Sequence, residues 1–559
     1  MALGDALSPE MRARMGRLRE NLLKRAQETV DAQLSQPKAP WQAKGMSPRA
    51  GGDSRSKQAP PKLSSPAASP SESLPWPLFG ERRTVLNASV QSKAKGLGTE
   101  PQEAPFRYWD LPPEAAVREP APTTITAEDR DSFTRFLLAG LPASRSEAKE
   151  DIFATIGLDF GTSTTKLIVR FPYEPGTPTI AIPAPAHCRS MGHPYLWQTV
   201  LWVSETGEFS PWPSENARLL HALKQGIMGR DADAAIVSDP KSQMPVTRAD
   251  AATAFLAFVV RYTRGWLLAN RPQIFRNRQP VWFLNVGMPV ANFDDARLVS
   301  IYRRTAAAAV LIANLEGAIT TETTSLFLKD PHVLAAMRSA DEAEKLGVAA
   351  LPETAAEAAG FAKSTNRAPG LYLMVDVGAM TFDVCTFRLG QADSATDRYG
   401  LLAAQVRPLG VEAYHWFLGD GKTQSDFAAQ CDRCLCEVVW RTRIKRDPHA
   451  ECWQAENDLP IFLAGGGAQN KLHRRIVEAL DPWLRQHSQN GGARLLELPI
   501  PANIELPIEV TDFNRLAVAW GLSYPPSEIG EIVPPSAVED KAPPPVLDWT
   551  KRFTGKEVV

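Results

Sequence analysis

This chain of 559 residues has little of what would place it in several large protein classes. Its 62 basic and 63 acidic residues nearly cancel, so its overall charge gives no reason to expect nucleic acid or an anionic membrane as a partner. No apolar run approaches the ~20 residues that a membrane-spanning helix needs. The longest candidates, residues 306–315 and 255–260, fit buried core helices. We therefore expect no nucleic acid partner and no transmembrane segment.

Cysteine is also scarce, with six residues in the whole chain. The N-terminus lacks the charged-then-apolar pattern of a signal peptide, so we expect a reducing, cytoplasmic environment. Cys431, Cys434 and Cys436, with Cys452, have a spacing that metal ligands can have. However, residues 426–440 have helical periodicity and no turn glycines, whereas structural zinc sites favour paired ligands on loops. Small buried thiols on a helix are the favoured interpretation.

Proline is abundant, at 47 residues, and its uneven distribution divides the chain. Within residues 8–35, apolar side chains recur at three- and four-residue steps, which predicts an amphipathic helix capped by Ser8. Residues 37–75 are rich in Pro, Ser, Ala and Lys, a composition typical of disorder. Aromatic islands at 76–79 and 106–109 precede a short helix predicted after Thr126. The predicted organisation is a partner-binding helix (1–36), a linker (37–150), an α/β domain (152–524) and a Pro-rich tail (525–559).

Residues 156–170 read as strand, tight turn, strand, with a polar tip between two apolar runs. Gly161 allows the backbone to approach a ligand closely, and successive turn N–H groups can form an anion-binding concavity. The hydroxyls of Thr162 and Ser163 add hydrogen-bond donors. Asp159 can hold Mg²⁺ through water, because Mg²⁺ usually keeps several waters. The segment therefore suits a phosphate, although an ordinary hairpin with a polar turn is the alternative.

Two later segments carry similar chemistry. Residues 371–388 again read as strand, turn, strand, and the turn region contains Asp376, Gly378, Thr381 and Asp383. Two such hairpins can face each other, with Asp159 and Asp376 flanking one metal-bound phosphate chain. Residues 459–472 read as a buried strand that enters a triple glycine, 465–467, and then a helix. Such a turn allows phosphates near the helix N-terminus.

In this order, the three segments resemble the phosphate-1, phosphate-2 and adenosine motifs of the actin, heat-shock chaperone and sugar-kinase ATPase superfamily. The resemblance is greatest to the ATPase domain of the seventy-kilodalton heat-shock chaperone class. Residues 219–230 look like the segment that carries the catalytic lysine of that class, and residues 282–290 look like its strand ending in Val-Pro. Residues 321–324 occupy the place of its Glu-Pro-Thr turn, and residues 516–522 resemble its second connecting helix. The resemblance covers residues 152–524.

The resemblance implies an α/β, two-lobed actin-like ATPase fold, with duplicated ribonuclease-H-like cores around a nucleotide cleft that binds ATP and Mg²⁺. Lys224 would orient the attacking water. The implied contacts are phosphate at Gly161, Thr162 and Ser163; Mg²⁺ at Asp159, Glu322 and Asp376; the γ-phosphate at Gly378 and Thr381, supported by Asp383; and adenosine at Gly465, Gly466 and Gly467. These roles agree with phosphoryl transfer, which depends mostly on positioning and charge stabilisation.

Three features depart from the chaperone pattern. Ala379 and Met380 stand where the family has glycines after Gly378, and Gln469 stands where the chaperones carry an arginine that stacks on adenine. Only about 35 Pro-rich residues follow Gly521, in place of a substrate-binding domain. A general peptide-clamping chaperone is therefore not the expected function.

Four functions stay open on the sequence. The favoured one is a Mg²⁺-dependent ATPase of chaperone-like architecture, in which nucleotide-driven lobe closure regulates or remodels a partner protein bound by the N-terminal helix. The others are a filament-forming actin-type ATPase, a small-molecule kinase of the sugar-kinase type, and a non-hydrolysing nucleotide-binding scaffold. The second hairpin, with Thr381 and Asp383, is of the chaperone rather than the kinase type, and no aspartate base for a sugar hydroxyl is apparent.

Overall fold

The structure is a computed structural model of the chain. It describes residues 28, 31, 35, 125–142, 150–229, 231–237, 245–289, 295–391, 396–454, 456–487, 491–510 and 512–541. These residues belong to one compact unit. The predictions for the N-terminal helix, the 37–75 linker, the two aromatic islands and the end of the tail concern mostly or wholly residues that are not described.

The first sheet has a central strand that is antiparallel to one neighbour and parallel to the other. β1 pairs antiparallel with β2 and parallel with β10. The strands run in the order β11 (Val348–Pro352), β10 (Arg278–Met288), β1 (Glu150–Phe160), β2 (Thr164–Arg170), β3 (Thr179–Ala181) and β17 (Ile504–Glu505), and β4 (Trp197–Gln198) also pairs with β2. The β1–β2 hairpin has the strand–turn–strand form that the sequence predicts for residues 156–170.

The second sheet is built in the same way around β12. β12 pairs antiparallel with β13 and parallel with β15. Its order is β16 (Gly492–Leu496), β15 (Asp458–Ala464), β12 (Gly370–Val377), β13 (Phe382–Gln391), β14 (Asp397–Arg407) and β18 (Glu531–Val533). Short strands outside the two sheets are β5 (Leu201–Val203), β6 (Phe209–Ser210), β7 (Arg218–Leu220), β8 (Ala235–Val237) and β9 (Val246–Thr247).

The two sheets repeat one topology. In each, a first, second and third strand form an antiparallel meander, and a fourth and fifth strand add in parallel beside the first. In each, a short late strand also pairs in parallel with the third strand: β17 with β3, and β18 with β14. The predicted α/β class is confirmed as a mixed α/β fold with mixed sheets.

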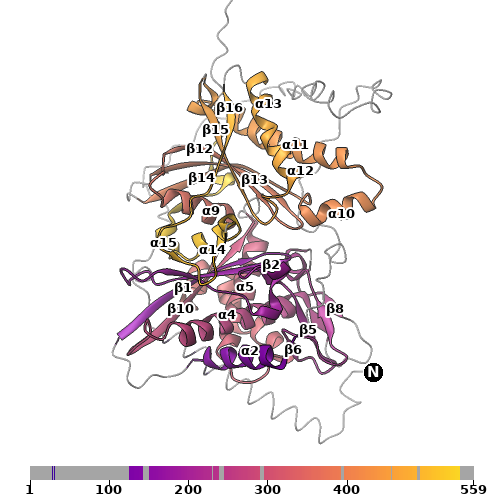
Figure 1. The fold of residues 1–559 in the computed structure, drawn as a ribbon, viewed down its shortest axis with the longest axis vertical. Coiled ribbons are helices and arrows are strands. Elements are labelled where there is room, and N and C mark those ends of the chain that lie inside the picture. The colour runs from indigo at the N-terminus through magenta and orange to yellow at the C-terminus, as the bar shows by residue number, and fades with distance from the viewer. Residues whose placement is uncertain are drawn as a thin grey trace, which may run out of the picture. The chain divides into compact units, whose positions relative to one another are not determined.

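Helices pack on the sheets and bury the side chains on both faces of the central strands. The helices are α2 (Ala127–Ala139), α3 (Leu223–Met228), α4 (Arg248–Asn270), α5 (Ala296–Ala313), α6 (Thr321–Leu328), α7 (Pro331–Arg338), α8 (Ala340–Lys345), α9 (Glu353–Ala362), α10 (Val411–Gly419), α11 (Gln424–Arg441), α12 (Lys471–Glu478), α13 (Leu480–His487), α14 (Ala517–Leu522) and α15 (Pro526–Ile529). Figure 1 shows α4 and α5 beside β1 and β10, and α11 and α12 beside the second sheet. Alternate residues of β1, from Ile152 to Phe160, share one core with α4 and α5.

The opposite faces of the two sheets meet α14 and α9. Trp520 and Ala519 of α14 pack with Ile168 of β2, whereas Phe361 of α9 packs with Tyr372 of β12. The two helices touch at backbone distance, since a Cβ on Gly521 would lie 1.8 Å from the carbonyl oxygen of Ala356. These helices therefore connect the cores of both sheets.

The fold extends beyond residues 152–524 at both ends. Before it, α2 is capped by Thr126 and inserts Phe133, 1 % exposed, into the core of the first sheet. The Phe133 ring stacks on Tyr262 of α4 with ring centroids 5.3 Å apart. After it, the Pro-rich segment forms α15 and β18 and continues to residue 541, where Lys541 contacts Asp447. Both short segments thus belong to the packed unit.

Within the described residues, no helix is long and apolar enough to cross a membrane. The predicted core helices at 255–260 and 306–315 correspond to α4 and to α5 with the residues after it. Cys431, Cys434 and Cys436 lie buried on α11, and neither they nor Cys452 form a disulfide.

Candidate functional site

Both hairpins place a carboxylate at the same point of their central strands. Asp159 is the next-to-last residue of β1, and Asp376 is the next-to-last residue of β12. The residues directly opposite on the second strands are Lys166 and Asp383. Corresponding strands of the two sheets therefore contribute an aspartate–lysine pair and an aspartate–aspartate pair.

The triple-glycine turn lies against the second of these pairs. β15 runs parallel to β12, so the turn after Ala464 lies at the edge where β12 also ends. The Gly467 N–H donates to the Val377 carbonyl at 2.7 Å. Gly465 has φ +80°, and a Cβ there would lie 1.9 Å from an Asp376 carboxylate oxygen. Glycine is required at 465 both by this conformation and by this close approach.

The tip of the first hairpin reaches the N-terminus of α10. The Ser163 hydroxyl donates to the Glu412 carboxylate at 2.5 Å. The Glu412 N–H donates to the Ala379 carbonyl at 2.7 Å, in the turn of the second hairpin. Through Glu412, the turns of the two hairpins are joined.

The Met380 side chain is packed in the core and does not extend toward the first hairpin. It is 1 % exposed and packs with Ala222, just before α3, and with Ala413 of α10. The Gly378 N–H donates to the Thr381 carbonyl at 2.9 Å and so closes the turn. Gly378 and Thr381 remain half-buried, as do Gly161, Thr162 and Ser163 of the first turn, while Gly466 is exposed and Gly467 buried.

Two buried lysines pair with carboxylates at the centre of the site. The Lys224 ammonium lies 2.7 Å from a Glu353 oxygen, and the Lys166 ammonium lies 2.8 Å from an Asp159 oxygen. Lys224 is the second residue of the short helix α3, which follows Ala222, a residue with a left-handed φ of +54°. It is 8 % exposed, so it is not a surface lysine.

Glu353 joins the two aspartates of the second hairpin. Carboxylate oxygens of Glu353, Asp376 and Asp383 all lie within 4.8 Å of one another. Glu353 comes directly after β11, which is parallel to β10 and so ends at the same edge as β10. Its position is fixed by the backbone, because its side chain lies against Gly287 of β10.

Glu322 is not part of this group. It lies in the first turn of α6, which begins after the capping residue Thr320 and packs with α4, α5 and α7. The expected turn at 321–324 is therefore helical, and the glutamate that lies with Asp376 and Asp383 is Glu353. Sequence reasoning missed Glu353 and Lys166. The signal for Glu353 was a carboxylate that directly follows a strand.

Burial and mutual repulsion control the charge of these groups. Burial, together with the negative charges of Glu353 and Asp159, raises the pKa of Asp376 to about 7. Burial and Asp376 raise the pKa of Asp383 well above its ordinary value. Burial opposes the charged form of Lys224, but Glu353 and Asp159 outweigh it and raise the pKa of Lys224. Lys224 is thus a fixed cation among carboxylates that resist ionisation.

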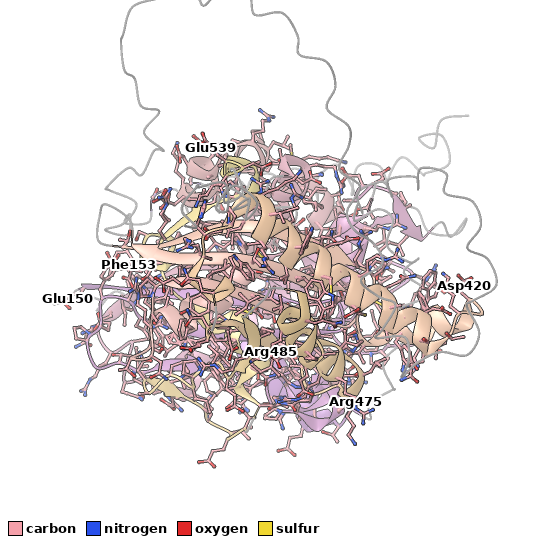
Figure 2. The ribbon with its side chains drawn as sticks, turned by 90° about the horizontal axis from the view of Figure 1, so that it is seen from above. Glu150, Phe153, Asp420, Arg475, Arg485 and Glu539 are labelled. Atoms are coloured by element: carbon pink, nitrogen blue, oxygen red, sulfur yellow. The ribbon has the colours of Figure 1, made fainter. Side chains whose placement is uncertain are left out.

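The cluster has the chemistry of a site for a hard divalent cation. One oxygen each of Asp376 and Asp383 is buried and has no hydrogen-bond partner among the described residues. Carboxylate oxygens are the ligands that Mg²⁺ and Ca²⁺ prefer. The residues present therefore fit a hard divalent cation such as Mg²⁺, because Glu353, Asp376 and Asp383 are close enough to share one ion. The charged residues Asp420, Arg475 and Arg485, labelled in Figure 2, are exposed and lie outside this cluster.

One cavity of the described part of the chain lies away from this cluster. It has a volume of about 190 Å³ and lies between α2 and residues 183–189, lined by Phe133, His187 and Tyr262 among others. The candidate site is identified by its chemistry and not by this cavity.

The sequence was also compared with protein-family models and with curated proteins, and nothing matches it in either comparison. The case for a function therefore rests on the residues and their geometry.

Proposed function

We propose that this protein is a Mg²⁺-dependent ATP-binding protein with ATPase activity, of the two-lobed actin-like fold and of chaperone-like architecture. The observation that carries the proposal is the repeated topology of the two sheets, which puts Asp159 and Asp376 at equivalent strand ends. Between them lie a buried lysine and a third carboxylate, Lys224 and Glu353. Paired hairpins with this set of charges suit a metal-bound phosphate chain.

In this proposal, each element of the site has one task. Asp159, Glu353 and Asp376 hold the magnesium ion, which when bound neutralises charge on the phosphate oxygens. The turns at 161–163 and 378–381 offer backbone N–H groups and hydroxyls to the phosphates. Within the triple glycine, Gly466 is exposed and leaves space for adenosine beside the backbone, whereas Gly465 and Gly467 lie against neighbouring side chains.

Lys224 holds the water that attacks the terminal phosphate. Its ammonium is kept charged by Glu353 and oriented by the 2.7 Å contact with it. A cation fixed before the substrate arrives costs no reorganisation when negative charge develops, which is the basis of electrostatic catalysis. Lys224 is a donor and not a base, since its pKa is raised.

Nucleotide controls the contact between the two halves. The Ser163 hydroxyl, assigned to phosphate, donates to Glu412, so phosphate and Glu412 compete for it. Exchange of this contact couples nucleotide binding to the position of α10. The resulting lobe movement regulates a partner protein, which the N-terminal helix binds.

The test is ATP binding and turnover by wild type, Glu353→Gln and Glu322→Gln. We expect wild type to bind ATP more tightly with Mg²⁺ than with EDTA in calorimetric titrations, and to release phosphate. Glu353→Gln should lower turnover by about 10²-fold, the usual cost of removing one preorganised electrostatic group. Glu322→Gln changes a carboxylate of α6 and should match wild type. Absence of ATP binding by folded wild type would overturn the proposal.

A nucleotide-binding switch without turnover is the second candidate. It is favoured by the burial of Met380 against Ala222 and Ala413, which fills the turn where the resembled family has glycines. It predicts Mg²⁺-dependent ATP binding without phosphate release above the uncatalysed rate. Phosphate release by wild type that Glu353→Gln abolishes would exclude this candidate.

A further inference from the structure

A fourth carboxylate extends the group formed by Glu353, Asp376 and Asp383, and no role above uses it. Glu357 lies one turn after Glu353 on α9, and positions four apart share one face of a helix. Glu357 is 0 % exposed. After burial, Asp376, Glu353, Asp159 and Asp383, in this order, act most strongly on its charge. Its place on the same face of α9 as Glu353 therefore puts Glu357 on the side of the helix that carries the cluster.

Neither oxygen of Glu357 has a hydrogen-bond partner among the described residues. The two nearby lysines are engaged elsewhere, Lys224 by Glu353 and Lys166 by Asp159. An ionised carboxylate that is buried and unpaired is strongly unfavourable.

The charge balance of the cluster points the same way. When all its members are ionised, five carboxylates (Asp159, Glu353, Glu357, Asp376 and Asp383) face two lysines (Lys166 and Lys224). The negative charges thus exceed the positive ones by three. The three carboxylates assigned to Mg²⁺ above would suffice for an ion that arrives with a nucleotide and keeps most of its waters. An additional buried carboxylate indicates an ion held by the protein itself.

We propose that Glu353, Glu357, Asp376 and Asp383 form a site that binds a hard divalent cation, of the Mg²⁺, Mn²⁺ and Ca²⁺ class, in the absence of nucleotide. This inference deepens the proposed function, because it concerns the same site, but cation binding does not require ATP. The cation supplies the partner that both Glu357 oxygens lack. Carboxylates brought within 4.8 Å, as three of the four are, can share one ion of this class.

The test is a titration of the nucleotide-free full chain with Mn²⁺, read as the loss of free Mn²⁺ signal in electron paramagnetic resonance. The protein is first stripped with EDTA. Wild type should bind Mn²⁺, and Mg²⁺ should compete. Glu357→Gln should weaken Mn²⁺ binding about tenfold or more, the low end of the loss that follows removal of a group supporting a metal site. Glu344→Gln on α8, another carboxylate with a pKa raised by burial, is the matched control and should bind as wild type does.

Thermal unfolding gives a second test of cation binding, and wild type alone is enough for it. Divalent cation should raise the wild-type Tm, because a ligand of the native state stabilises it. Glu357→Gln should have a higher Tm than wild type in EDTA and should respond less to Mn²⁺. Should Glu357→Gln not fold, the Tm of wild type with and without Mn²⁺ still decides.

The inference is overturned when stripped wild type neither binds Mn²⁺ nor changes its Tm with it, or when Glu357→Gln binds as tightly as wild type. These failures are separate from failure of the proposed function. Cation binding without any ATP binding overturns the ATPase proposal alone. Mg²⁺-dependent ATP binding without nucleotide-free Mn²⁺ binding overturns the four-carboxylate site alone.

Discussion

Removal of the Lys224 ammonium tests whether the Lys224–Glu353 ion pair behaves as an isolated pair or as part of a cluster that has more carboxylates than lysines. Lys224→Met keeps an unbranched side chain of similar length but leaves Glu353 without its partner. Both side chains are buried, at 10 % and 7 % exposure. Removal of one member of a buried pair typically costs 3–5 kcal/mol.

The cost can be worked out from the proton that Glu353 would take up. Its ordinary pKa is 4.5. Protonation at pH 7 then costs about 3 kcal/mol, at ~1.36 kcal/mol per pH unit. At pH 5 the same step costs about 1 kcal/mol. Lys224→Met should therefore lower the free energy of unfolding by about 3 kcal/mol at pH 7 and much less at pH 5.

Removal of the carboxylate of this pair should lower the free energy of unfolding less than removal of the ammonium. Glu353→Gln leaves Lys224 beside Asp159 and removes one charge from a cluster with too many carboxylates, so we expect a loss below about 1.5 kcal/mol. The double variant should recover most of the Lys224→Met loss. Urea unfolding of the EDTA-treated protein measures all four free energies as a double-mutant cycle.

The matched control is an exposed pair of the same residue types. The Lys345 ammonium nitrogen lies 2.6 Å from a Glu342 carboxylate oxygen, and the two side chains are 47 % and 41 % exposed. Lys345→Met should cost at most about 1 kcal/mol at either pH. The reasoning is refuted if Lys224→Met costs no more than Lys345→Met at pH 7, or if its cost does not fall at pH 5.

Two further outcomes follow from the buried carboxylates and from α2. Because the pKa of Asp376 is raised to about 7 in the folded state, the native state holds its proton more tightly than the unfolded state. Without divalent cation, stability should therefore decrease as the pH rises from about 4 to 7, by at most about 4 kcal/mol for this group, and urea unfolding across pH measures it. A stability that rises over this interval would contradict the assigned burial. In the same assay, Phe133→Ala should lower the free energy of unfolding by about 3–5 kcal/mol. Leu138 lies on the same helix but is 65 % exposed, so Leu138→Ala should lower it little. Equal effects of the two would mean that α2 does not contribute to the core.

Local sequence pattern was enough to predict the strands and turns that carry the two aspartates. At β1 and β12, an apolar run stops at a carboxylate and a glycine and then resumes, and the two strands of each hairpin pair directly. The same holds for the triple glycine, since a strand followed by glycines and a helix is a local signal. These are contacts between neighbours in the chain.

The position of Glu353 could not be predicted in this way. Glu322 and Glu353 both lie near the start of a short helix, and both have threonine neighbours. What separates them is that Glu353 follows β11, whose pairing with β10 joins residues some 60 positions apart. Such a pairing depends on the whole sheet, so local pattern gave no preference for the correct glutamate.

Composition was misleading for the chain segments at the two ends of the fold. The 525–541 segment reads as a tail because it is Pro-rich, yet it adds β18 as a short edge strand, where proline is tolerated. Residues 127–139 read as a helix within a linker, yet the Phe133 ring lies among Tyr262, Trp197 and Trp212. A few buried contacts outweigh the average polarity of a segment, and only tertiary structure shows them.

The charge arrangement explains why the two halves of the fold need each other. Asp159 and Lys166 come from the first sheet, Asp376 and Asp383 from the second, and α9 carries Glu353 and Glu357 between them. The second sheet alone has two adjacent carboxylates and no lysine of the cluster, so its charges repel. Lys166 and Lys224, which the first half supplies, compensate only part of the repulsion that acts on Asp376. To the extent that these carboxylates are ionised, their remaining repulsion opposes contact between the halves. A divalent cation bound as proposed above would reduce this repulsion and would therefore favour contact between the halves.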